Sequence, residues 1–242
     1  MLCISLFFCL SQAFSAGLVS TVSSPDVAKH ILNAGLRFGY DFGKTNSNQG
    51  GNFIVRQQFE YGFTDIYSAR IQFIQNRPQY GVWRQKAVGF QNRIEFVDEQ
   101  KDGWGASLRA SYQYRSGRDH HDTVRTSFLY LLPHIMGTEF RQNILLQYNA
   151  DKDLRDGLEL EFRTQMIAPY SDNLHIGLEM MNIFPSFTHH NIMQNDTHQI
   201  GPIMKTKLTE NVSLQTGYRF TTNGKTDAHG LMLYLGQKLT ID

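Results

Sequence analysis

The chain has 242 residues and a formal net charge of +1, with 41% hydrophobic, 19% charged and 12% aromatic residues. Because the net charge is close to zero, bulk electrostatics predict no nucleic-acid partner. No segment reaches the run of about 20 apolar residues that a membrane-spanning helix needs. Composition therefore leaves two classes open, a water-soluble all-β protein and a membrane-spanning β-barrel.

Residues 1–16 have the pattern of a secretory signal peptide. Residues 2–10 form a short apolar core, and small residues follow it. The alternative is a buried apolar terminal segment. Both cysteines, Cys3 and Cys9, lie in this region, so the exported chain would contain none and could not rely on disulfides for its stability. Residues 17–29 are predicted to be a short periplasmic N-terminal segment, and residues 30–242 a single domain.

From residue 31 onward, segments of about ten residues alternate apolar and polar side chains. This period of two is typical of β-strands. Clusters of Gly, Asn, Asp, Lys and Pro separate the segments and indicate turns. The predicted strands are 31–42, 53–63, 66–75, 87–97, 104–115, 123–132, 139–149, 157–167, 174–182, 197–207, 212–220 and 230–239.

The connections between these segments alternate between short and long. This alternation is typical of transmembrane barrels, which have tight turns at one end and longer loops at the other. Twelve strands is an even number, so both chain ends would lie on the side of the short turns. We therefore predict an all-β fold, a single closed antiparallel transmembrane β-barrel of twelve strands. Ten strands is the alternative, because merging a predicted pair of segments changes the count by one hairpin.

The distribution of charge within the strands favours a barrel whose outer face meets lipid. When each strand is phased by its apolar residues, every charged residue within a strand falls on the inward face. An outward Arg or Lys at mid-depth would destabilise such a barrel by about 2–4 kcal/mol. The predicted lumen-lining residues are Arg37, Arg56, Arg70, Arg93, Arg109, Arg125, Arg141, Arg163, Arg219, Glu60, Glu95, Glu159, Glu161 and Glu179.

Aromatic residues gather at both ends of the predicted strands. Such rings anchor a barrel at the two membrane interfaces, whereas a soluble sandwich would place them in mid-strand. Next to the long loops are Tyr40, Phe42, Phe53, Phe73, Tyr112, Tyr114, Tyr148, Tyr218 and Phe220. Near the short turns are Phe63, Tyr67, Phe96, Trp104 and Tyr130.

Residues 30–242 resemble the outer-membrane β-barrel proteins of Gram-negative bacteria. The most similar phrases are Tyr61-Gly62-Phe63-Thr64-Asp65, residues 171–179, residues 198–202 and residues 208–214. Strand count and size are also similar to those of the small twelve-stranded porins for acidic saccharides. The resemblance implies a bacterial outer-membrane location. It also implies contact with outer-membrane lipid and lipopolysaccharide, and insertion by the barrel assembly machinery.

The main functional hypothesis is based on the charged residues of the lumen. Arginines exceed carboxylates on the inward face, and Arg70, Arg93 and Arg109 lie near mid-height on three consecutive strands. Since guanidinium groups are permanently charged and match anionic groups in shape, we expect a small porin or channel for polar or anionic solutes. The alternative is a structural or adhesive barrel in which glutamates pair with the arginines and close the lumen.

A hydrolase is a further alternative with less support. The tetrapeptide Asp119-His120-His121-Asp122 has the residue types of an outer-membrane protease site, but one loop does not supply converging groups. Histidines at positions 189, 190 and 198 lie near methionines, a combination that can bind transition metals, yet their spacing matches no defined site. We therefore predict no enzyme activity, no cofactor and no metal.

Overall fold

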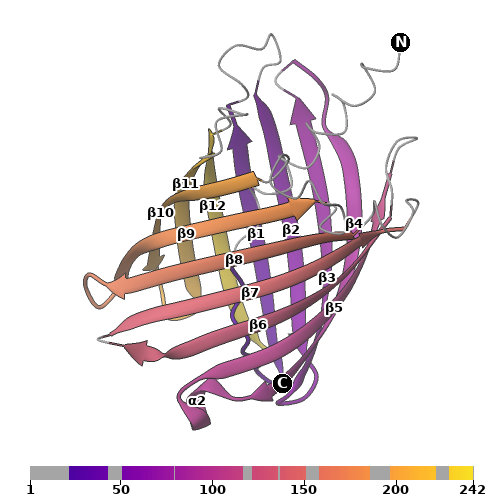
Figure 1. The fold of residues 1–242 in the computed structure, drawn as a ribbon. Helices are drawn as coiled ribbons and strands as arrows, with labels where there is room; N and C mark the ends of the chain where they lie inside the picture. Colours follow the sequence, from indigo (N-terminus) through magenta and orange to yellow (C-terminus); the bar gives the residue numbers. More distant parts are fainter. Residues whose placement is uncertain are drawn as a thin grey trace.

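The computed structural model describes residues 22–42, 51–78, 80–116, 122–135, 137–150, 158–185, 197–221 and 229–241. In these residues, twelve strands form one closed barrel (Figure 1). Each strand pairs antiparallel with its neighbours in the sequence, and β12 closes the barrel against β1, with Leu36 opposite Leu235. The prediction of a closed antiparallel barrel of twelve strands is confirmed.

The bounds of most strands lie within a few residues of the predicted segments. The strands are β1 (Ile31–Asp41), β2 (Asn52–Gly62), β3 (Tyr67–Pro78), β4 (Arg84–Val97), β5 (Gly105–Arg115), β6 (Thr123–Ile135), β7 (Thr138–Asn149), β8 (Leu158–Pro169), β9 (Leu174–Pro185), β10 (Thr197–Lys207), β11 (Val212–Thr221) and β12 (His229–Thr240).

Prolines mark the ends of three strands. Strands β3, β8 and β9 end at Pro78, Pro169 and Pro185, because proline has no N–H to donate to the next position of the ladder. The predicted end of β3 at residue 75 came too early. The polar residues that follow resembled a loop, but their backbone still pairs, and Pro78 lies opposite Asn52.

The two ends of the barrel differ in their connections. We call the end at which β1 begins and β12 ends the turn end, and the opposite end the loop end. At the turn end, the connection between β4 and β5 contains helix α2 (Glu99–Asp102), a single turn. The Asp98 carboxylate accepts from the Gln100 N–H, and Gly103 (φ 74°) ends the helix. No helix in the described part of the chain is long and apolar enough to cross a membrane.

Burial alternates along the strands, with apolar side chains outside and charged ones inside. On β4, Phe90 and Ile94 are each 52% exposed, whereas Arg93 and Glu95 are each 5% exposed. A water-soluble protein has the reverse arrangement. The exposed apolar face is therefore suited to lipid, and the buried polar face forms the lumen.

Ile144, at the middle of β7, tests this assignment of the outer face. It is 37% exposed and lies opposite Phe128 and Phe162. Ile144→Arg is expected to lower the free energy of unfolding by about 2–4 kcal/mol, measured by urea unfolding in phospholipid vesicles. Ile144→Met is the uncharged control. A loss for the arginine variant no larger than that of the control would contradict a lipid-facing position.

Candidate functional site

The charged residues that the sequence predicts to line the lumen are buried or half-buried in the structure. Ten of these side chains are at most 9% exposed: Arg37, Arg56, Arg93, Arg109, Arg163, Arg219, Glu60, Glu95, Glu161 and Glu179. The other four, Arg70, Arg125, Arg141 and Glu159, are half-buried. Because the exposed residues of each strand face outward, these buried side chains point into the lumen.

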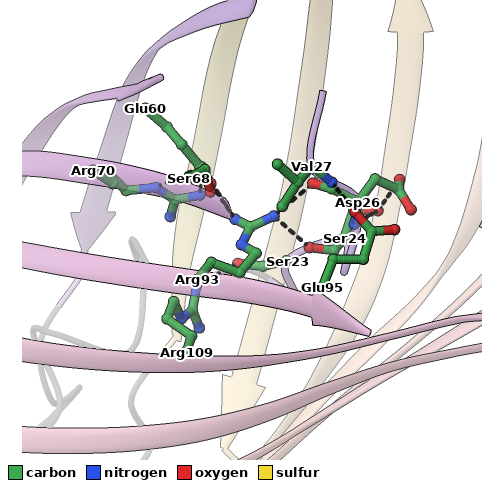
Figure 2. Close-up of polar contacts among 10 residues, drawn as sticks. All are labelled: Ser23, Ser24, Asp26, Val27, Glu60, Ser68, Arg70, Arg93, Glu95 and Arg109. Carbon is green, nitrogen blue, oxygen red and sulfur yellow. Dashed lines mark hydrogen bonds and ion pairs between the residues drawn. The ribbon is translucent and has the colours of Figure 1, made fainter. Parts of the chain in front are cut away.

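Glu60 on β2 connects arginines from two other strands. Its carboxylate accepts from Arg70 Nε at 2.8 Å and from Ser68 Oγ at 2.7 Å, and its Oε1 lies 2.8 Å from Arg93 Nη2. The register creates the first pair, since Glu60 lies opposite Arg70. Figure 2 shows Arg93 between this carboxylate and a chain segment inside the barrel. One negative charge is thus shared by two guanidinium groups.

Two further ion pairs are deeply buried. Arg163 Nη2 donates to Glu161 Oε2 at 2.8 Å, two residues away on the same face of β8. Arg219 Nη2 on β11 lies 2.9 Å from Glu179 Oε1 on β9. These contacts join neighbouring parts of the wall and neutralise part of the lumen's positive charge.

Arg56 on β2 lies among other arginines. The register sets it directly opposite Arg37, whose guanidinium lies over the Tyr234 ring at 4.7 Å from the centroid. Arg56 is 9% exposed, and its Nε has no hydrogen-bond partner among the described residues. The charged groups acting most strongly on Arg56 are all arginines. We call the set of Arg37, Arg56, Arg70, Arg125 and Arg163 the arginine cluster.

Residues 22–30, which we call the N-terminal segment, enter the barrel at its turn end. There a backbone N–H of the segment donates to the Gly62 carbonyl at 2.8 Å. The segment reaches β9, where the Val22 N–H donates to Glu179 Oε1 at 3.0 Å. The sequence predicts a periplasmic segment at 17–29. The described part of that range lies against the inner wall of the barrel, and residues 1–21 lie outside the described residues.

Uncharged inward residues were missed at the level of sequence. Buried amide side chains occur at Gln58, Gln72, Asn143, Gln147, Gln165, Gln199 and Gln215. Leu129, Leu131 and Leu145 are at most 1% exposed and also face inward. Their signal was present, because each falls on the same alternate positions as the charged residues of its strand. A prediction based on charge alone does not include them.

Most of the proposed loop residues lie outside the described part of the chain. This holds for Asp119, His120 and His121 and for the histidines at 189 and 190. Asp122 is described, and its carboxylate accepts hydrogen bonds from the Tyr112 hydroxyl and the Arg115 N–H. Across the described ranges, no group of three or more His, Cys, Asp or Glu side chains could hold a metal ion.

Comparison with known proteins identifies similar folds. No protein-family model matches the sequence, and no curated protein matches it. The structure is similar to the NanC porin (TM-score 0.61, 10% identity, 85% of this chain and 100% of that one) and to the KdgM porin (TM-score 0.59, 7% identity, 85% and 98%). It is also similar to an outer-membrane channel of Pseudomonas putida F1 (TM-score 0.62, 8% identity, 88% and 97%). The chain thus has the barrel fold of twelve-stranded outer-membrane porins.

Proposed function

We propose that this protein is an outer-membrane channel for small polar or anionic solutes, which pass through the arginine-rich lumen. The wall would attract an anion by its excess of permanent positive charge and would hold it through guanidinium hydrogen bonds. No cofactor takes part in this function, since the driving force is the concentration gradient of the solute.

The observation that carries this proposal is the environment of Arg56. A buried arginine whose Nε has no hydrogen-bond partner within the described ranges, and which lies opposite Arg37 in the strand register, would destabilise an empty barrel. An anion that enters the arginine cluster would supply the missing charge and the missing acceptor. KdgM, a protein of similar fold, has a solved structure in complex with a disordered oligogalacturonate, which is a polyanion.

The outer face supports the membrane location in this proposal. Phe38, Phe90, Leu108 and Leu178 are 41–52% exposed on four different strands, and a barrel in water would bury such side chains. Aromatic contacts occur at the strand ends, for example between Trp104 and Tyr130 at 5.7 Å. We propose outer-membrane lipid and lipopolysaccharide as the surroundings, and the barrel assembly machinery as the insertion partner.

A closed structural barrel is the second candidate. It is favoured by the ion pairs of Glu60, Glu161 and Glu179 and by the N-terminal segment inside the lumen. The two candidates differ in one measurable property, which is ionic current. They agree on the fold and on the lipid-facing surface.

Planar-bilayer recording of the purified protein under a KCl gradient tests the proposal. A channel of the proposed kind gives discrete current steps, and its reversal potential shifts toward the chloride equilibrium potential. A shift toward the potassium equilibrium potential would contradict the preference for anions. If no current appears in the wild type or after removal of residues 22–27, the closed structural barrel is the better description.

A further inference from the structure

The arginines at the turn end bind the N-terminal segment. Arg93 Nη1 donates to the Ser24 carbonyl at 3.0 Å and to the Asp26 carbonyl at 2.8 Å. Arg109 Nη1 donates to Ser23 Oγ at 3.0 Å. In the register of β4 and β5 the two arginines lie directly opposite each other. The segment thus occupies a pair of adjacent guanidinium groups that face the lumen (Figure 2).

The inner face of the barrel wall also has a surface that is complementary in shape to this segment. We call this surface, formed by Arg93, Gly105, Arg109 and Asn143, the seat. Pro25 is less than 2% exposed and packs against Gly105, where an added Cβ would lie 2.7 Å from the proline Cγ. In the amide orientation that satisfies both atoms, Asn143 accepts from the Ser23 N–H at 2.9 Å and donates to the Ser23 carbonyl at 3.2 Å. A side chain at position 105 would push the segment away, so the wall and the segment are complementary.

The hydrogen bonds that hold the segment on the seat are nevertheless ones that an anionic solute could accept in its place. Residues 22–28 have no regular secondary structure, and the hydrogen bonds that Arg93 and Arg109 donate to the segment end on carbonyl and hydroxyl oxygens. A carboxylate or phosphate offers a guanidinium two parallel hydrogen bonds and a full negative charge. Such a group would bind these arginines more strongly than a carbonyl or a hydroxyl does.

We propose that residues 22–29 are a displaceable plug, which competes with the permeating anion for Arg93 and Arg109. With the plug seated, the turn end of the lumen is occupied and the conductance is low. With the plug displaced, the two arginines join the arginine cluster in a continuous cationic path. The competition with an anion rests on the proposed channel function, whereas the occlusion of the lumen by the segment does not.

A disulfide between the plug and the wall tests the occlusion. The ideal Cβ of residue 105 lies 3.6 Å from the Pro25 Cβ, within the range of about 3.5–4.5 Å for a disulfide. The double variant Pro25→Cys/Gly105→Cys is made with Cys3 and Cys9 replaced by serine. We expect its oxidised form to stay at low conductance, and reduction to raise the conductance several-fold. The single variant Pro25→Cys is the control and should not respond to reduction.

Deletion of residues 22–27 provides a second, independent test. The deletion is expected to raise the conductance above that of the wild type. If the shortened chain does not fold, the disulfide experiment alone tests whether the segment blocks the lumen. If the oxidised and reduced forms of the double variant have equal conductance, residues 22–29 do not block the lumen. This result would not contradict the proposed channel function. If reduction raises the conductance but the channel prefers cations, the proposed anion selectivity is wrong. The proposal that residues 22–29 block the lumen would then still be supported.

Thiol labelling of the single variant Pro25→Cys tests the competition itself. Because this position is buried in the seated plug, a maleimide should react slowly with it. An oligogalacturonate is expected to accelerate the labelling several-fold, and a neutral oligosaccharide of matched length should not. If the two probes give the same rate, an anion does not displace the plug.

Glu99 of helix α2 lies beside the plug, since its Cβ is 3.5 Å from the ideal Cβ position of Gly105, against which Pro25 packs. We expect this contact to make the seating of the plug dependent on pH. Partial burial, followed by the nearby Asp26 carboxylate and a hydrogen bond with it, raises the pKa of Glu99 from 4.5 to about 7. The other charged groups near Glu99 and Asp26 are Arg141 and Glu139 on β7, Arg93 and Glu95 on β4, and Asp98. Glu95 accepts a hydrogen bond from the Val27 N–H at 2.6 Å, so its ionised form favours the seated plug and opposes the effect of Glu99. The raised pKa of Glu99 means that its contact with Asp26 is favourable at low pH and is lost as the pH rises through about 7.

We therefore expect the conductance of the wild type to increase between pH 6 and pH 8. Over this interval Glu99 ionises beside Asp26, and repulsion between the two carboxylates weakens the seat. Glu99→Gln should abolish the increase, while Glu210→Gln, in the exposed turn between β10 and β11, should retain it. A pH response that persists in Glu99→Gln would assign the effect to another group.

Discussion

Replacing Glu179 with alanine is expected to lower the free energy of unfolding by about 3–5 kcal/mol. Glu179 and Arg219 have side chains that are 1% and 2% exposed, and Glu179 Oε1 lies 2.9 Å from Arg219 Nη2. The alanine variant removes the carboxylate of this buried ion pair. It also removes the acceptor of the Val22 N–H. The loss therefore combines a broken buried ion pair with a released backbone donor.

Two further variants separate the effect of charge from that of packing. Urea unfolding in phospholipid vesicles measures all three. Glu210→Ala, in an exposed turn, should change the free energy of unfolding by less than about 0.5 kcal/mol. Replacing both partners, as in Glu179→Met/Arg219→Leu, should recover most of the loss, because apolar residues of similar volume can substitute for a buried pair. A loss below about 1 kcal/mol in Glu179→Ala would show that water or another group neutralises Arg219.

Periodicity made the barrel predictable, because a strand with one face toward lipid and one toward the lumen repeats every two residues. The same periodicity predicted which arginines lie on the buried face of each strand. It could not show that Arg56 faces Arg37, since cross-strand partners depend on the register of two strands that a loop separates. Nor could it show that Arg219 reaches Glu179, which lies two strands away.

The place of the N-terminal segment could not be predicted from the sequence. Residues 22–28 have neither a strand period nor a helical one, so a local pattern assigns them no place. Their contacts with the barrel wall are distant in sequence, as in the bond from Val22 to Glu179 and the bond from Arg109 to Ser23. One local feature was informative, since Gly105 begins a strand, where a packed side chain is usual, and instead leaves room for Pro25.

Arg56→Glu is expected to lower the preference for anions and to stabilise the empty barrel at the same time. The variant changes the charge of the arginine cluster by two units. At about 4 Å in water each unit contributes about 1 kcal/mol to the energy of a passing ion. An anion is therefore destabilised by about 2 kcal/mol and a cation is stabilised by about the same amount. The anion-to-cation permeability ratio should then fall on the order of 1,000-fold, which corresponds to about 4 kcal/mol. Reversal potentials under a KCl gradient measure this ratio.

The stability of the same variant distinguishes a functional role from a structural one. Glutamate at position 56 would lie opposite Arg37 and replace a like-charge pair by an ion pair, so the free energy of unfolding should rise by about 1 kcal/mol. Arg84→Glu, at the exposed start of β4, is the matched control and should leave stability and selectivity nearly unchanged. If Arg56→Glu were instead destabilising, Arg56 would be held by partners that the empty barrel already supplies. A gain in stability with a loss of selectivity would show that the barrel keeps Arg56 for the anion and not for the fold.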